Sequence, residues 1–513
     1  MALRRTVALA IAWLAYVVSV PGATRLPDAA VRAMERLTPA DVRGYVEQLA
    51  SDAMGGRGVG EPGNRAAEEY ICAAFRTSGV TPAGTDGSCY QPVDVYRPAP
   101  GPRARLRVWR DTGAPVIDLT PGDDFYPLPE SGSVAASGPV VFAGHGMVAP
   151  AQKHDDYDGV NARGAIVIVL DNAPETLRGD LSTLETKIAN ATSRGAAALV
   201  IVRETLSDYR QIWPVQGAGS RDSIYRLVSS LDPGLPVAAL SEPRARLIRR
   251  MLTNGTQLTA TLTPDLAADS LTIRNVLGIV EGRDPARRGE AVVVGAHMDH
   301  DGTDANGRVY NGADDNASGT AAVLAAATAF ARAAADGERP ARPVIFALWN
   351  GEEKGSLGAE AFVAAPGGRR VIANLNLDMV GRHEEIPDPA NWRWAGLPKV
   401  DRAASGNTLH VLGYSYSPDL AAELRDANDA VGLTLLEDYD VGAQDLLKRS
   451  DHWPFLSRGI PALFLTTGLH PDYHTPDDDV ERIDFGKLAR VARLAARAAW
   501  IVADGPPPAL KKR

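Results

Sequence analysis

The second half of the chain alternates short, almost entirely apolar runs with longer helical stretches, and this alternation is the strongest constraint on the fold. From about Thr272 the apolar runs are EAVVVGAH, RPVIFALWN, VIANLNLDMVG and IPALFLTTG, and helix-like stretches such as SGTAAVLAAATAFARAAA lie between them. Strands that are apolar along their whole length are buried on both faces, so helices must cover both sides of the sheet. We therefore predict an α/β fold with a mixed, mostly parallel sheet flanked by helices.

Residues 136–265 have a different texture. They contain short β-branched runs separated by Gly, Pro and Asp, with one helix-like stretch, TLETKIANATSRG. This pattern predicts a compact, mainly-β module. We expect it to be inserted between two parts of one larger domain, residues 24–135 and 266–504, and we expect the tail 505–513 to be disordered.

Residues 1–23 have the layout of a secretory signal peptide. Two arginines precede an apolar run from Val7 to Val20, and small residues follow at a cleavage point after Gly22 or Ala23. The alternative, an uncleaved membrane anchor, is disfavoured because the run is shorter than the about 20 residues that a spanning helix needs. We expect an exported protein, periplasmic or secreted, with no stable membrane span once the signal is removed.

The net charge and the cysteine content indicate which classes of partner and which cellular compartments are compatible with the chain. The 513 residues carry a formal net charge of −9 and no basic block apart from the final KKR, which argues against nucleic acid as a partner. The two cysteines, Cys72 and Cys89, could pair in an oxidising compartment or remain two buried thiols. The sequence leaves both possibilities open.

Side chains that can bind a metal follow the apolar strands of the second half. They are His297 with Asp299 two residues later, Asp315 before the next helix, Glu352 and Glu353, Asp378, and His474. Ligands of open α/β sheets bind beyond the carboxyl ends of the strands. We therefore expect these side chains to meet at one edge of the sheet.

The chemistry of this set indicates two divalent metal ions. Three carboxylates about 5 Å apart repel one another by roughly 3 kcal/mol per pair at an effective dielectric of about 20, so the site needs cations. Oxygen and imidazole ligands without a thiolate suit zinc, with manganese or cobalt as substitutes. A single carboxylate of the Asp314–Asp315 pair could bridge both ions, because the small residues at 317–319 give a short, crowded turn.

The remaining acidic residues indicate how such a site could hydrolyse an amide. Asp299 and His297 point to the same face of an extended chain, so the carboxylate can hold the imidazole ring. Glu352 and Glu353 are adjacent and diverge, so one can bind metal while the other acts as a base. A metal lowers the pKa of water towards about 7, and a free glutamate can pass that proton to the leaving amine.

Together, the motifs HMDHDG, NGADDNASGTAAVL, WNGEEKGSLGAEAF, NLNLDMVGR and YHTPDDD resemble the secreted di-zinc aminopeptidases, relatives of leucyl aminopeptidase and glutamate carboxypeptidase. The likeness extends to GGRGVGEPGNRAAEEYI and SDHWPFLSRGIPALF, and so covers nearly the whole chain after the leader. It implies a catalytic domain of the zinc-exopeptidase type, formed by residues 24–135 and 266–504. Residues 136–265 resemble an inserted protease-associated domain.

This resemblance implies a role for each candidate ligand. One zinc ion would be held by His297, Asp315 and Asp378. A second would be held by Asp315, Glu353 and His474, so the carboxylate of Asp315 would bridge the two ions.

Other positions take roles from the same resemblance. Glu352 would be the general acid and base that acts on a metal-bridging water. The phenol of Tyr473 would stabilise the oxyanion or would only pack. A cis peptide bond is expected between Asp299 and His300, and Asp314 is assigned an ordinary turn role.

Four of the histidines outside the ligand pattern compete with these assignments. His300 and His470 are near ligands in the sequence but do not match it. His452, in SDHWPF, either lines the cleft or packs, and His145 in the mainly-β module is expected to be structural.

The activity implied is that of a zinc aminopeptidase, a metallo-exopeptidase that removes N-terminal residues from peptides with a free N-terminus. A carboxypeptidase of the same fold is the nearest alternative, and it would need a basic cluster such as Lys448 and Arg449 at the substrate carboxylate. A glutaminyl cyclase would use one metal. A non-catalytic receptor on this fold would have lost ligands, and none is missing here.

Overall fold

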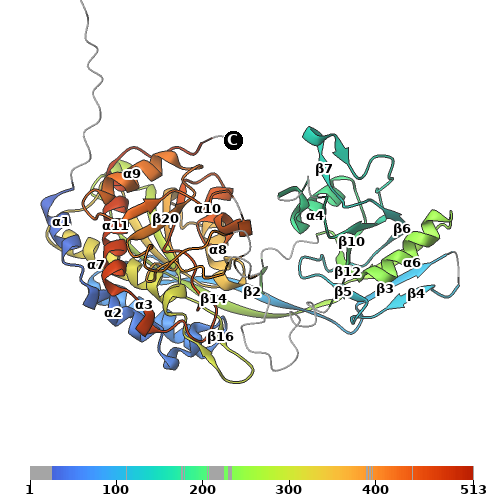
Figure 1. The fold of residues 1–513 in the computed structure, drawn as a ribbon, viewed down its shortest axis with the longest axis horizontal. Coiled ribbons are helices and arrows are strands. Elements are labelled where there is room, and N and C mark those ends of the chain that lie inside the picture. Colours follow the sequence, from blue (N-terminus) through green and yellow to red (C-terminus); the bar gives the residue numbers. More distant parts are fainter. Residues whose placement is uncertain are drawn as a thin grey trace, which may run out of the picture.

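The computed structural model describes residues 26–511, apart from gaps at 111–112, 175–176, 178–179, 205, 207–224, 229–233, 389–390, 392–393, 395–396 and 442. The predicted signal peptide therefore lies outside the described residues. The described chain forms two modules, each built on its own sheet (Figure 1).

The main module contains a ten-stranded sheet in the order β11-β2-β14-β18-β15-β19-β22-β20-β21, with β1 paired to β14. The strands are β1 (Thr81–Pro82), β2 (Tyr90–Pro100), β11 (Arg226–Leu227), β14 (Leu266–Val280), β15 (Glu290–His297), β18 (Val344–Trp349), β19 (Arg370–Leu377), β20 (Thr408–Leu412), β21 (Thr434–Leu436) and β22 (Ala462–Thr466). The sheet is mixed, as predicted. Its parallel strands are concentrated in the centre, where β18, β15, β19 and β22 run side by side in one direction.

Helices cover both faces of this sheet. They are α1 (Asp28–Glu35), α2 (Pro39–Leu49), α3 (Pro62–Ser78), α7 (Gly319–Ala335), α8 (Leu357–Ala364), α9 (Pro418–Asn428), α10 (Trp453–Ser457) and α11 (Phe485–Asp504). The two hydrophobic clusters divide strand β15 by alternate residues. Val292 and Val294 pack on the side of α7 and α11, whereas Ala291 and Val293 pack on the side of α8 and α10. This two-sided burial explains why the strands are apolar throughout.

Helix boundaries follow the signals in the sequence. Thr38 caps α2 by accepting a hydrogen bond from the backbone N–H of Asp41, whose carboxylate in turn accepts from the N–H of Thr38. Helix α3 ends at Gly79, which adopts a left-handed conformation with φ of 84°.

The inserted module contains an eight-stranded sheet in the order β4-β3-β13-β6-β9-β10-β12-β5. Its elements are β3 (Arg105–Trp109), β4 (Ile117–Leu119), β5 (Phe125–Pro127), β6 (Ala136–Phe142), β9 (Ile166–Leu170), α4 (Leu184–Ser193), β10 (Ala198–Arg203), β12 (Val237–Ser241), α6 (Glu242–Thr253) and β13 (Thr259–Thr263). The boundary predicted at residue 136 is wrong, because the sheet already includes three strands that precede it. Helix α6 is a further addition to the single helix predicted for this module.

Long strands join the modules. In Figure 1, β2 and β14 extend from the main sheet towards the inserted module, and their antiparallel pairing runs from Tyr90 opposite Val276 to Pro100 opposite Leu266. Strand β11, which lies between β10 and β12 in the sequence, returns to pair with β2 in the main sheet. The connection therefore consists of continuous sheet hydrogen bonds.

The described part of the C-terminal tail is ordered, contrary to the prediction of disorder for 505–513. The backbone N–H of Ala509 donates to Asp419, and that of Lys511 donates to the carbonyl oxygen of Tyr416. Leu510 packs against the main hydrophobic core on the α10 side. The Pro-rich sequence restricts the unfolded tail, so these contacts have less conformational entropy to overcome.

Among the described residues, one helical stretch, Ala313–Ala335, is long and apolar enough to span a membrane, with a mean hydropathy of 1.2. It contains α7, and 83% of its most apolar window is buried inside the protein.

Cys72 and Cys89 form a disulfide, which selects one of the two possibilities left open by the sequence. Cys72 lies in α3, and Cys89 immediately precedes β2. The bond therefore ties a helix of the main module to the strand that leads into the inserted module.

Replacing both cysteines with serine should lower the free energy of unfolding by about 3 kcal/mol, the value expected for a closed loop of this size. The measurement is the thermal unfolding midpoint of the main module by calorimetry. A reducing agent should lower the midpoint of the wild type and leave that of the double variant unchanged. An unchanged wild-type midpoint under reduction would show that the disulfide does not stabilise this module.

Candidate metal centre

The four central parallel strands deliver the candidate residues to one edge of the sheet. His297 is the last residue of β15 and lies opposite Trp349 at the end of β18, just before the turn that contains Glu352. Asp378 directly follows β19. The loop after β22 supplies His474. The prediction that strand ends converge is therefore confirmed by the register of the sheet.

Asp315 lies between two histidines. Its Oδ1 is 3.4 Å from Nε2 of His297, and its Oδ2 is 3.1 Å from Nε2 of His474. Asp378 completes the first group, with Oδ1 3.2 Å from His297 Nε2. Glu353 completes the second, with Oε2 3.4 Å from His474 Nε2. One carboxylate thus presents one oxygen to each of two adjacent groups of ligand atoms.

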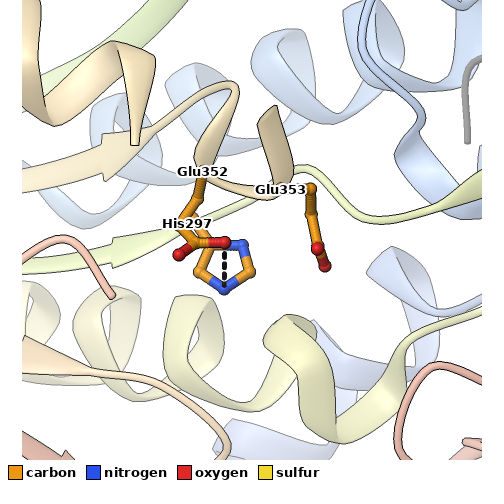
Figure 2. A group of neighbouring side chains, drawn as sticks. All are labelled: His297, Glu352 and Glu353. Carbon is orange, nitrogen blue, oxygen red and sulfur yellow. Dashed lines mark ion pairs between the residues drawn. The ribbon is translucent and has the colours of Figure 1, made fainter. Parts of the chain in front are cut away.

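Glu352 and Glu353 come from the same turn and diverge. Figure 2 shows the carboxylate of Glu352 above the ring of His297, whereas Glu353 is directed to the side. The distance from Glu352 Oε2 to His297 Nε2 is 3.9 Å. Glu353 instead faces His474 and His300. The divergence predicted for adjacent residues therefore gives each glutamate a separate environment.

The electrostatics of the site are dominated by burial. Burial raises the pKa of Glu352 well above its usual value, and the nearby Asp451 and Glu353 carboxylates add to this effect despite opposition from His297. Burial also opposes ionisation of Asp315, but the adjacent imidazoles of His297 and His474 outweigh it and hold the pKa of Asp315 well below its usual value. Asp315 is therefore anionic, whereas Glu352 is poised to carry a proton.

The arrangement fits a pair of metal ions. Groups of ligand atoms within 4.8 Å of one another include His297 with Asp315 and Asp378, and also Asp301 with Glu353 and His474. The donors are carboxylate oxygens and imidazole nitrogens, which suit zinc. Within the described part of the chain, the buried atoms His297 Nε2 and Asp378 Oδ1 have no hydrogen-bond partner, as expected of atoms reserved for a cation.

Asp299 acts differently from the prediction. The Nδ1 atom of His297 hydrogen-bonds to the backbone carbonyl oxygen of Asp299 at 3.1 Å, whereas the nearer carboxylate oxygen of Asp299 is 4.0 Å away. The carboxylate instead accepts hydrogen bonds from the backbone N–H groups of Glu352 and Glu353. Asp299 therefore orients the ring through its main chain and fixes the glutamate turn through its side chain.

Two residues of the HMDHDG motif, to which the sequence analysis gave no role, contact candidate ligands. Asp301 Oδ2 lies 3.1 Å from Nδ1 of His474, on the side of the ring away from Asp315. Nδ1 of His300 hydrogen-bonds to Oε1 of Glu353 at 2.8 Å. Both are positioning contacts behind candidate ligands. The spacing of Asp301 could not reveal this contact, because His474 comes from a distant loop.

Asp314 is also more than an ordinary turn residue. It is fully buried, accepts a hydrogen bond from the backbone N–H of Gly381, and lies 3.2 Å from His470 Nε2. Asp478 accepts hydrogen bonds from the backbone N–H groups of both Asp314 and Asp315. Each aspartate of the pair is therefore anchored from outside its own turn.

The cis peptide bond of this region lies between Asp315 and Asn316, not between Asp299 and His300 as expected. The Asn316 side chain donates to the carbonyl oxygen of Leu377 and accepts from the N–H of Gly319. The side chain thus joins the turn to the end of β19.

The SDHWPF segment supports the centre from the other side. Ser450 donates to Asp378 Oδ2 at 2.7 Å and accepts from Asn376. Burial, together with neighbouring carboxylates, raises the pKa of Asp451 well above its usual value. His452 is buried, stacks on Phe464, and has a pKa lowered to about 3 by burial. Of the two roles left open for His452, packing is the one observed.

A cavity opens from the candidate ligands. Its lining includes apolar side chains, namely Met379, Leu412, Leu446, Phe464 and Leu469. Tyr473 also lines it, and burial raises the pKa of that phenol, which therefore stays protonated. The cavity lining thus combines the candidate ligands with apolar side chains, as is usual for a site that binds an organic molecule.

The segment that carries the candidate ligands is similar in sequence to known proteins. Residues 275–499 match Peptidase family M28. The matched segment carries all the candidate ligands.

Two relatives and one solved structure illustrate the similarity. A probable leucine aminopeptidase of Arthroderma benhamiae is 29% identical over 228 residues, covering 43% of this chain and 56% of that protein. Aminopeptidase YwaD of Bacillus subtilis is 25% identical over 398 residues, covering 74% of this chain and 72% of that protein. The chain thus spans about half the length of the first relative. The structure of the aminopeptidase from Aneurinibacillus sp. strain AM-1 has the same fold, with a TM-score of 0.53 at 18% identity over 94% of this chain and 97% of that one.

Replacing Asp301 with asparagine should weaken metal binding by about 10- to 100-fold at one of two sites, because the carboxylate orients His474. Competition of Zn²⁺ with a chromogenic chelator measures both affinities. The matched control is Asp304→Asn, which lies in the same loop and contacts Arg308 instead of the centre. An unaltered pair of affinities in Asp301→Asn would show that the contact does not position a ligand.

Proposed function

We propose that the protein is a zinc aminopeptidase that removes residues from peptides with a free N-terminus. The observation that carries the proposal is the carboxylate of Asp315, placed between His297 and His474 at the mouth of the cavity. The names of the relatives support it, since they include a probable leucine aminopeptidase and an aminopeptidase.

Two zinc ions would share the site. One would be bound by His297, Asp315 and Asp378, and the other by Asp315, Glu353 and His474. Zinc bound there would supply a Lewis acid for the substrate carbonyl and would acidify a water molecule. A probable zinc metalloprotease of Leptosphaeria maculans, 30% identical over 260 residues, supports the choice of metal.

The protein's own groups would move the proton and stabilise charge. Glu352 is held in place by the contact of its backbone N–H with Asp299, and its carboxylate faces the cavity. Because burial favours its protonated form, it can take a proton from water and return it to the leaving amine. Tyr473 keeps its hydroxyl proton and could donate it to the oxyanion.

The cavity favours an aminopeptidase over a carboxypeptidase. A substrate carboxylate would need several basic groups, but Arg449 is the single Lys or Arg among the described residues that line the cavity. Lys448 instead lies over the ring of Trp453. The apolar side chains of the lining suit the side chain of an N-terminal residue.

The proposal also covers the inserted module and the location of the protein. We infer that the inserted module is a protease-associated domain and that the protein is exported. The signal-like leader in the sequence and the disulfide between Cys72 and Cys89 support an oxidising compartment.

The test is hydrolysis of aminoacyl-p-nitroanilides by the purified protein loaded with zinc. We expect activity that a chelator abolishes, that requires a free α-amino group, and that Glu352→Gln lowers about 10²- to 10⁴-fold with zinc retained. Glu360→Gln is the matched control, since Glu360 lies on α8 and contacts Arg458. Activity confined to substrates with a free C-terminal carboxylate would support the carboxypeptidase instead.

A further inference from the structure

The cavity contains a buried carboxylate that the proposed mechanism does not use. Glu384 lines the cavity, and its side chain is only 5% exposed. Its Oε1 accepts a hydrogen bond from the hydroxyl of Tyr439 at 3.0 Å, and its Oε2 lies 3.2 Å from His410 Nε2. A buried carboxylate in a largely apolar pocket is costly unless its charge is balanced.

His410 provides that balance from outside the cavity. Its side chain is 1% exposed on β20, and its Nδ1 hydrogen-bonds to Asp438 at 2.8 Å. Burial disfavours the imidazolium, but the hydrogen bonds to Asp438 and Glu384 outweigh it and raise the pKa of His410 to about 9. His410 is therefore cationic at neutral pH. Asp438 is 38% exposed, so solvent screens its charge more than that of Glu384.

The local backbone is shaped around this network. The ring of Tyr439 stacks on that of His410, with centroids 5.0 Å apart. Both oxygens of Asp440 accept backbone N–H groups beyond the end of β20, from Gly413 and Ser415, which anchors the Tyr439 loop. Gly468 has φ of +89°, and a Cβ there would lie 2.7 Å from side-chain atoms of Glu384. Only glycine leaves room for the carboxylate.

Two other cations lie near Glu384. Lys487 is buried and donates to the carbonyl oxygens of Arg382 and Ser405, so its hydrogen bonds serve the backbone. Arg449 lines the cavity but is exposed to solvent. His410 is the cation placed within ion-pair distance of Glu384.

We propose that the Glu384–His410 pair determines the specificity of the side-chain pocket, with His410 neutralising Glu384 so that the pocket accepts an uncharged N-terminal side chain. This inference rests on the proposed aminopeptidase function. Tyr439 assists by occupying one oxygen of Glu384. Loss of the histidine charge exposes a carboxylate to the substrate side chain, and the pocket then favours a cation.

The test compares lysine with norleucine, whose side chains differ only in the terminal ammonium group. The p-nitroanilides of both are assayed with the wild type, His410→Gln, Glu384→Gln and the double variant. The ratio of kcat/KM for lysine to that for norleucine should rise about ten-fold in His410→Gln, because an unbalanced charge acts strongly at low dielectric. The double variant should return to the wild-type ratio. Tyr439→Phe removes the hydrogen bond to one oxygen of Glu384, so the ratio of kcat/KM should also rise in this variant, but by less.

His383→Gln is the matched control, because His383 precedes Glu384 but pairs with Asp484, outside the cavity. Its ratio should equal that of the wild type. An unchanged ratio in both His410→Gln and Tyr439→Phe would overturn the proposal, as would a raised ratio that persists in the double variant. An equal loss on both substrates in Glu384→Gln would show that Glu384 binds the α-ammonium group instead.

A binding measurement separates this inference from the proposed activity. Calorimetry with L-lysinamide and L-norleucinamide on zinc-loaded Glu352→Gln, with and without His410→Gln, needs no turnover. We expect the affinity ratio to shift towards lysinamide by about the same factor. If the affinity ratio shifts but no zinc-loaded protein hydrolyses any substrate, the proposed role of the Glu384–His410 pair is kept and the aminopeptidase proposal is rejected. If the affinity ratio does not shift, the proposed role of the pair is rejected even when hydrolysis is observed.

Discussion

The carboxylate of Asp315 lies between the imidazoles of His297 and His474, and much of the surrounding structure holds it there. Asp478 accepts the backbone N–H groups of the turn, and Asn316 ties that turn to the end of β19. The small residues after it allow α7 to begin immediately beneath the site. A carboxylate that bridged two cations would need this rigidity, since each of its oxygens would serve a different cation.

The same constraint explains the density of buried acidic groups. Glu352 and Asp378 follow two strands that flank β15, and Asp315 joins them from the turn before α7. Their mutual repulsion is relieved only by cations or by protons. Glu352 lies where protonation is favoured, whereas Asp315 lies where the two histidines keep it ionised. Burial thus separates a proton carrier from a metal ligand of similar chemistry.

Charge balance recurs in the cavity beyond the metals. Glu384 is matched by His410, which reaches it from strand β20, so the carboxylate contributes shape and hydrogen bonding without an open charge. In both places a histidine balances buried carboxylates. At the centre two histidines also face the metal positions, whereas His410 lies behind the pocket wall.

The sequence by itself determined the mixed α/β sheet, because strands that are apolar along their whole length are visible as a local pattern. It also determined that the candidate ligands meet, because residues that follow parallel strands lie at one edge of the sheet. These ligands are His297, Asp315, Glu353, Asp378 and His474. Only the tertiary structure decided that the Asp299 carboxylate holds the glutamate turn, that Asp301 supports His474, that the cysteines pair and that the tail docks. Each of these contacts joins segments far apart in the chain or depends on backbone geometry. The balance between Glu384 and His410 was decided in the same way, because a buried charge acquires its role from neighbours that the fold brings to it.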